Sequence, residues 1–186
     1  MQETIRCKRI IQELLEFSRE SEPNIVLANI NDTIERALHI LENEFRLRHI
    51  RLEKQLSSET PDILMDKSQI EQVLVNLLLN AVQAIEDQGI ITISSDKMPG
   101  ENRVKVEISD TGCGIPPEHM TKIFDPFFST KAKGTGLGLA VSYGIVQKHQ
   151  GRIYASCGPG GKGAVFTLEV PMPSDTSSKE TAGGRK

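Results

Sequence analysis

The chain has 186 residues, of which 38% are hydrophobic and 25% are charged, as is ordinary for a globular protein with a substantial core. Its net charge of −3 excludes the concentrated positive charge of most nucleic-acid binders, so we expect no nucleic acid partner. Three scattered cysteines indicate neither disulfides nor a metal cluster, and no run is apolar enough to span a membrane. We therefore expect a cytoplasmic location for this chain, although a longer parent protein could be membrane-anchored.

The first predicted element is an amphipathic helix over residues 2–20, because apolar side chains recur there at steps of three and four. Pro23 ends it, since the residue before a proline is pushed out of the helical region. One helix cannot bury such a stripe alone, so residues 1–22 are expected to belong to a larger helical bundle.

The next predicted elements alternate irregularly between helix and strand. Helices are predicted at 31–48, 67–88 and 138–149, and strands at about 50–56, 62–65, 90–95, 104–109, 152–157 and 164–170. This order predicts an α/β fold of the α+β kind, in which helices cover one face of a single mixed sheet. The tail 174–186 is small and polar and is predicted to be disordered.

An amide stripe runs along the predicted helix 67–88. Gln72, Asn76, Asn80 and Gln83 follow one another at steps of four, four and three, which places them on one face of a helix that is otherwise apolar. The oxygen of an asparagine amide is a hard ligand that suits Mg²⁺. Two asparagines alone are equally compatible with core amides whose hydrogen bonds are satisfied inside the protein.

A carboxylate followed by a glycine turn comes next, in the segment Asp110-Thr-Gly-Cys-Gly114 at the end of a predicted strand. A carboxylate can accept the amino group of adenine and cannot pair with the carbonyl of guanine. Gly112 and Gly114 would let the backbone approach a base closely. An ordinary turn is the alternative for this segment.

A second glycine segment, Gly134-Thr-Gly-Leu-Gly138, precedes the predicted helix 138–149, so its amides could hold anionic oxygens. It matches neither the dinucleotide fingerprint nor the P-loop pattern. Lys131 stands just upstream and could contact a phosphate, although a solvated surface lysine is the alternative.

Aromatic residues gather just before that loop, where Phe124, Phe127 and Phe128 surround Pro126. They could form core, but the flanking proline and hydroxyl residues favour a loop that docks and releases. The four histidines show no spacing typical of metal ligands, and Cys113 has no partner that would make it reactive, so none of these five residues is assigned a role.

Taken in order, these segments resemble the catalytic ATP-binding domain of sensor histidine kinases, within the superfamily of gyrase, Hsp90 and MutL, over about residues 24–173. Residues 72–81 are similar to the family's N box, 110–114 to its first glycine box, 124–128 to its F box, 134–139 to its second glycine box and 161–166 to its last glycine segment. The run Phe-Phe-Ser-Thr-Lys before the glycine loop resembles the short ATP lid of nitrogen-sensor-like kinases.

The resemblance implies a Bergerat-type two-layer α/β sandwich that binds ATP and Mg²⁺. It implies that Asn80 ligates the metal, that Asn76 orients the phosphates and the metal's waters, that Asp110 reads adenine, and that Asn76 and Lys131 act in catalysis. The residues expected to bind the nucleotide are Asn76, Asn80, Gln83, Asp110, Gly112, Gly114, Ile115, Phe124, Lys131, Gly134, Thr135, Gly136, Leu137, Gly138 and Leu139.

Residues 1–22 resemble the second helix of the kinase dimerisation hairpin, which implies a catalytic domain over 23–173 and a tail over 174–186. The implied partners are ATP, a hairpin that bears the phosphoacceptor histidine, a response-regulator receiver domain, and a second copy in a homodimeric parent kinase. The chain departs from the family in lacking a His-Glu-x-x-x-Pro segment, so we expect it to be part of a larger kinase. It also has Gln83 where a basic residue is common and Ala164 where a hydroxyl is common.

The expected function is transfer of the γ-phosphate of Mg-ATP to a histidine that this chain lacks, for relay to a response-regulator aspartate. Two alternatives remain open. One is an ATP-hydrolysing module of the same superfamily, whose members carry a glutamate where this chain has Asn76, and an amide cannot activate water as a base. The other is a module that only senses ATP.

Overall fold

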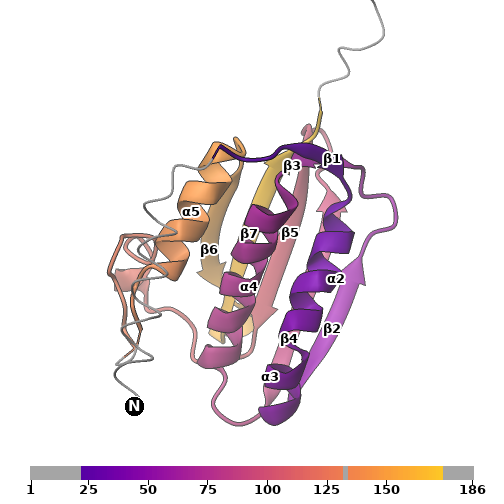
Figure 1. The fold of residues 1–186 in the computed structure, drawn as a ribbon. Helices are drawn as coiled ribbons and strands as arrows, with labels where there is room; N and C mark the ends of the chain where they lie inside the picture. Colours follow the sequence, from indigo (N-terminus) through magenta and orange to yellow (C-terminus); the bar gives the residue numbers. More distant parts are fainter. Residues whose placement is uncertain (1–21, 132–133, 174–186) are drawn as a thin grey trace, which may run out of the picture.

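A five-stranded mixed sheet forms one layer of the molecule (Figure 1). The computed structural model describes residues 22–131 and 134–173. In spatial order the strands are β2 (Ile50–Leu56), β4 (Gly89–Lys97), β5 (Arg103–Asp110), β7 (Ala164–Pro171) and β6 (Arg152–Cys157). Strands β2 and β4 are parallel, and all other neighbours in this sheet are antiparallel.

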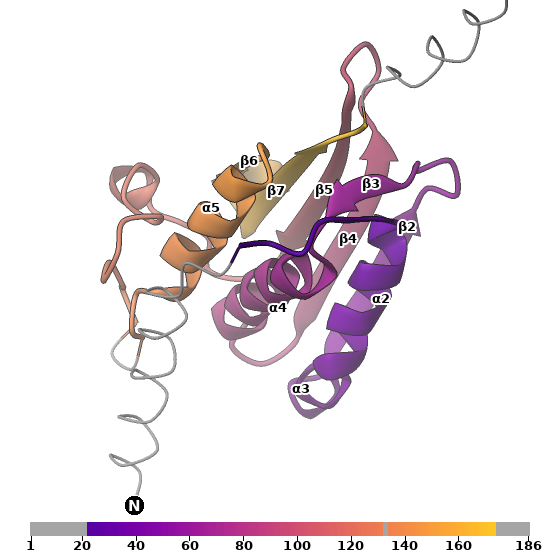
Figure 2. The ribbon, with the colours of Figure 1, turned by 45° about the horizontal axis from the view of Figure 1, so that its top comes forward.

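The helices form the second layer, on one face of the sheet (Figure 2). They are α2 (Ile30–Ile40), α3 (Glu42–Leu47), α4 (Lys67–Ala84) and α5 (Gly138–Lys148), with short 3-10 turns η1 (Pro117–His119) and η2 (Pro159–Gly161). The expected fold class, a mixed sheet covered by helices on one face, is therefore confirmed.

The helix expected at 31–48 is two helices, α2 and α3. The break lies at Leu41, whose φ of −102° and ψ of 5° leave the helical region, and whose N–H bonds the carbonyl of Leu38 in a tighter turn. Leu41, at the break, and Phe45, one turn after it, are both buried. The bend therefore keeps both side chains on the core.

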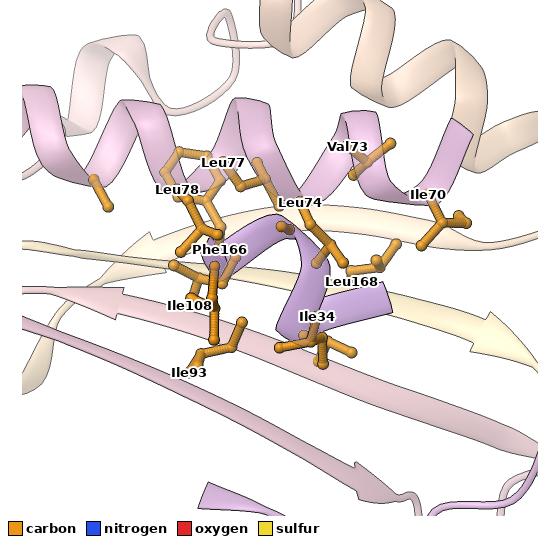
Figure 3. Close-up of a cluster of buried hydrophobic side chains, with 14 of the residues drawn as sticks. Ile34, Ile70, Val73, Leu74, Leu77, Leu78, Ile93, Ile108, Phe166 and Leu168 are labelled. Atoms are coloured by element: carbon orange, nitrogen blue, oxygen red, sulfur yellow. The ribbon is translucent and has the colours of Figure 1, made fainter. Parts of the chain in front are cut away.

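Helix α4 is central because most of its circumference is buried. Its side chains Leu74, Leu77 and Leu78 lie over side chains of the sheet such as Ile108 and Phe166 (Figure 3). Each such buried leucine contributes about 1.5–3 kcal/mol through removal of apolar surface from water. The burial of α4 fixes where its polar stripe can lie.

Helix α4 ends at Ala84, four residues earlier than the sequence predicts. Ile85 is extended, with φ of −92° and ψ of 122°, and the carbonyl of Ala84 accepts a hydrogen bond from the N–H of Cys113 at 3.0 Å. The helix thus ends where the loop after β5 supplies the hydrogen-bond donor for its last carbonyl.

A short antiparallel ribbon of β1 (Val26–Ala28) and β3 (Ile63–Met65) closes one end of the helical layer. Strand β1 was not expected from the sequence. The helix predicted at 2–20 and the disorder predicted for 174–186 both lie outside the described residues. Within the described ranges, no helix combines the length and hydropathy needed to cross a bilayer.

Candidate functional site

The amide stripe of α4 faces the beginning of α5. The Nδ2 group of Asn76 donates to the carbonyl of Gly138 at 3.3 Å and to the hydroxyl of Ser142 at 3.4 Å. Ser142 is fully buried, and its hydroxyl donates to the same Gly138 carbonyl at 2.9 Å. These bonds hold the second half of α4 against the first turn of α5.

Further along the stripe, two amide oxygens hold the ammonium group of Lys131. Its Nζ lies 2.9 Å from Oδ1 of Asn80 and 2.7 Å from Oε1 of Gln83. Desolvation of the ammonium group lowers the pKa of Lys131, and the nearby Cys113 and Asp110 only partly offset that effect. The residue as a whole is nevertheless exposed. The amides therefore already form a site for one cation.

Asp110 ends β5 as a buried carboxylate, with only 3% of its surface exposed. Its Oδ1 accepts a hydrogen bond from the N–H of Gly112 at 2.8 Å, and the backbone of Ala164 also bonds to the carboxylate. Burial raises the pKa of Asp110, and these two hydrogen bonds together with Lys131 reduce the rise. A further hydrogen-bond donor at this carboxylate would therefore stabilise its ionised form.

The glycine turn after Asp110 packs against backbone on two sides. A side chain at Gly112 would collide with the carbonyl of Ala84, at the end of α4. Gly114 has φ of +75°, and a side chain there would lie 3.0 Å from the carbonyl of Gly163. Both glycines are needed for the loop to lie this close to α4 and β7. Ile115, next in the chain, packs partly buried against the core.

The aromatic loop and the second glycine loop are joined by backbone. The N–H of Phe127 donates to the carbonyl of Gly136 at 3.0 Å, and both residues have positive φ, of 66° and 70°. Phe124 packs its ring against Tyr143 of α5, with centroids 5.8 Å apart, and Phe128 packs against His119 at 5.3 Å. Phe124 and Phe128 thus attach the loop to the fold, whereas Phe127 is 66% exposed.

The beginning of α5 lacks a side-chain cap. Leu137, the capping residue, is buried, and its N–H bonds the hydroxyl of Thr135 at 3.4 Å. The N–H of Gly134 bonds the carbonyl of Lys131 at 3.0 Å. Gly138 and Leu139 open the helix and are half-buried. Helix amides without a side-chain cap are suited to anionic oxygens.

The structure brings together expected residues from four segments. Asn76 of α4 meets Gly138 in the first turn of α5, and Lys131 meets Asn80 and Gln83 of α4 and lies near Asp110 at the end of β5. Ser142 and Tyr143 were not singled out in the sequence, although Ser142 stands one helical turn after Gly138 and so faces the same neighbour. A cavity of about 550 Å³ lies elsewhere, around the ends of β2 and β4 and the turn at Met98, and none of the expected residues lines it.

Comparisons with known proteins show what this chain is similar to. The model of the family described as "Histidine kinase-, DNA gyrase B-, and HSP90-like ATPase" matches residues 65–174. The sensor histidine kinase ZraS of Salmonella typhi is 39% identical over 170 residues, which cover 91% of this chain and 36% of that protein.

Solved structures agree with the sequence match. The catalytic domain of histidine kinase ThkA superposes with a TM-score of 0.73 and 34% identity, covering 80% of this chain and 95% of that one. The same kinase in complex with response regulator protein TrrA gives a TM-score of 0.79 and 32% identity, covering 92% of this chain and 49% of that one. Compared with the kinase ZraS of Salmonella typhi, the chain spans about a third of the full length.

Proposed function

Because this chain belongs to the family of histidine kinase-, DNA gyrase B- and HSP90-like ATPases, we propose that it is the ATP-binding catalytic core of a sensor histidine kinase. In this proposal it transfers the γ-phosphate of Mg-ATP to a histidine on a dimerisation hairpin. The observation that carries the proposal is the position of the Lys131 ammonium group, which lies between the amide oxygens of Asn80 and Gln83 and within electrostatic reach of Asp110.

The donor set fits magnesium. Asn80 and Gln83 offer neutral oxygens that already hold a positive group, and hard oxygens of this kind are ligands that Mg²⁺ accepts. Among residues 22–131 and 134–173, no cluster of three or more histidine, cysteine or acidic residues could hold a metal alone. Asn80 would therefore hold the ion together with triphosphate oxygens and water. The ion would neutralise charge on the transferred phosphate.

Asp110 is the proposed adenine reader. Its carboxylate is buried and keeps its hydrogen bonds to two backbone N–H groups, so it is fixed as an acceptor. The exocyclic amino group of adenine is a donor, whereas guanine presents a carbonyl in the same position. Gly112 and Gly114 let the turn lie close against Ala84 and Gly163, which holds the backbone beside Asp110 in place. Adenine is therefore preferred over guanine. Ile115 and Phe124 are the proposed apolar neighbours of the nucleotide.

The phosphates are proposed to lie at the beginning of α5. The amides of the loop with Gly134, Thr135, Gly136, Leu137, Gly138 and Leu139 are suited to anionic oxygens. Asn76 positions this turn through the Gly138 carbonyl and would orient the phosphates. Lys131 would contact phosphate oxygens once a metal ion displaced it from Asn80. Because an amide cannot take a proton from water at neutral pH, the site favours transfer over hydrolysis.

The partners follow from this assignment. We propose that residues 1–22 are the end of a dimerisation hairpin whose other helix carries the phosphoacceptor histidine, that 23–173 form the catalytic domain, and that 174–186 are a tail. A response-regulator receiver domain would then accept the phosphate, and the similar kinase ThkA has been solved in complex with response regulator protein TrrA. The parent kinase would act as a homodimer, and its catalytic core would work in the cytoplasm, where ATP is available.

Labelling of a supplied hairpin tests the proposal. A hairpin that carries a His-Glu segment should acquire acid-labile phosphate from γ-labelled ATP when this chain is present. Rapid release of inorganic phosphate by the chain alone, without labelling of the hairpin, would favour an ATP-hydrolysing module instead.

A further inference from the structure

His149 is a buried histidine at the end of α5, far from the residues proposed to contact ATP. Only 5% of its surface is exposed. Its Nε2 accepts a hydrogen bond from the backbone N–H of Asp66 at 3.0 Å, so Nδ1, which lies 2.8 Å from the carbonyl of Ile145, carries the ring proton. The imidazole is thus neutral, has one defined tautomer, and spans two backbone groups.

Asp66 is the N-cap residue of α4 and directly precedes Lys67. Its Oδ1 accepts hydrogen bonds from the N–H groups of Ser68 and Gln69 at 3.0 and 3.1 Å, which caps the helix. Its Oδ2 accepts the N–H of Asn24 at 2.8 Å. Asp66 is therefore held rigidly, and the bond from its N–H to His149 joins the start of α4 to the end of α5.

A second tie joins the same two helices at their other meeting point, where Asn76 bonds Gly138 and Ser142. The two helices lie side by side (Figure 1), and they run antiparallel because the start of α4 meets the end of α5. At a rise of about 1.5 Å per residue, the two ties are roughly 15 Å apart along α4 and along α5 alike. The apolar contact between them is not directional, so it resists separation of the helices better than it resists sliding. Directional hydrogen bonds at both ends fix the sliding register.

We propose that His149 is a positioning residue for the nucleotide site. Through Asp66 it sets the register of α5 against α4, and so places the first-turn amides of α5 opposite Asn76. This inference rests on the proposed function for the identity of the ligand. A change of register should weaken contacts to the phosphates, which need both helices, more than contacts to the base, which lie on the turn after β5.

Two substitutions that differ by one methylene test the inference. The oxygen of Gln in His149→Gln can reach the position of Nε2, whereas the oxygen of Asn in His149→Asn reaches only the position of Nδ1. Mg-ATP and adenosine affinities are measured by calorimetry at a temperature at which circular dichroism shows both variants folded. His149→Asn should lose about two- to tenfold in Mg-ATP affinity, the change that one neutral hydrogen bond supports, with a smaller change for adenosine. His149→Gln should keep the wild-type ratio of the two affinities.

Equal losses for both ligands in His149→Asn, or an unchanged Mg-ATP affinity, would overturn the inference, as would a Gln variant that behaves like the Asn variant. If His149→Asn does not fold, NMR of the wild type and the affinities of His149→Gln decide. A coupling across the hydrogen bond between the Asp66 amide and Nε2, together with an unchanged affinity ratio in His149→Gln, supports the inference. Absence of the coupling, or a changed ratio in His149→Gln, rejects it. A wild-type chain that binds Mg-ATP no better than adenosine would contradict the proposed function. The tie would then be judged by the coupling and by shifts of the Gly138 amide in the variants.

Discussion

The ammonium nitrogen of Lys131 lies 2.9 Å from Oδ1 of Asn80, the oxygen that we propose as the magnesium ligand. A lysine and a divalent cation cannot share that oxygen, because their charges repel at such a distance. Binding of Mg-ATP therefore requires Lys131 to move away from Asn80, and the negative phosphates are the destination that its charge favours. Lys131 would thus exchange one acceptor for another as the ligand binds.

Replacement of Lys131 should separate its competition with Mg²⁺ at Asn80 from its contact with the phosphates. Lys131→Met leaves Asn80 without its competing cation, so half-maximal ATP binding should need less Mg²⁺. The affinity for ATP at saturating Mg²⁺ should fall, by about 1–3 kcal/mol for the loss of a charged hydrogen bond. Calorimetry across a Mg²⁺ series measures both effects. Lys97→Met, at the exposed end of β4, is the matched control and should change neither. An unaltered Mg²⁺ requirement in Lys131→Met would contradict the exchange.

Asp110→Asn should weaken binding of ATP and adenosine alike. The substitution can turn an amide donor toward the amino group of adenine, or toward the N–H of Gly112 that the carboxylate now accepts. A buried donor left without a partner costs about 1–3 kcal/mol. Calorimetry with both ligands checks this expectation, and equal affinities in wild type and variant would remove Asp110 from the reading of the base.

Gly136→Val should impair the glycine loop. Gly136 has φ of +70°, and a side chain there would meet the backbone of Phe127. The variant should bind Mg-ATP more weakly while binding adenosine nearly as well, because the base lies on another loop. Gly144→Ala is the control within α5: nothing lies within 4 Å of its added carbon, and it should stabilise the helix by about 0.5–1 kcal/mol. Equal losses of both ligands in Gly136→Val would indicate unfolding.

The carboxylate of Asp66 should make the free energy of unfolding depend on pH. Burial raises the pKa of its carboxyl, but hydrogen bonds from Ser68, Gln69 and Asn24 outweigh burial, so the pKa is lowered overall. Because the pKa is lower in the folded state, the ionised carboxylate stabilises the fold fully at a pH above its unfolded pKa of about 4. This stabilisation is lost as the pH falls through the pKa of the folded state. Asp66→Asn should therefore cost about 1 kcal/mol at neutral pH, and progressively less below about pH 4. Urea unfolding over a pH series measures the difference, and a cost that grows toward acid pH would contradict the assignment.

Much of the fold can be predicted from periodicity. The spacing of Ile70, Leu74, Leu77 and Leu78 indicates a buried helix, and the strands of the main sheet lie within a few residues of their predicted limits. The break at Leu41 could not be predicted, because Leu41 and Phe45 keep helical spacing across it. Strand β1 has only three residues, too few to show an alternating pattern.

The candidate site could likewise be predicted from the sequence only in part. Asn76, Asn80 and Asp110 stand in ordered motifs, and their spacing along a helix or after a strand indicates where they lie. Contacts between distant segments have no such local signal: Lys131 meets Asn80 across 51 residues, and His149 meets Asp66 across 83. A histidine that bonds backbone atoms needs no particular residue type opposite it, so the sequence pattern carries no trace of this tie.

Phosphate transfer tests the central claim most directly. The chain is fused to a hairpin that bears the His-Glu segment, which avoids weak docking between separate proteins, and is incubated with γ-labelled ATP and Mg²⁺. We expect acid-labile phosphate on the hairpin histidine, little release of inorganic phosphate, and loss of labelling in Asn80→Ala because the metal ligand is gone. A wild-type fusion that binds Mg-ATP but leaves the histidine unlabelled, or that releases phosphate rapidly, would contradict the assignment as a histidine kinase core.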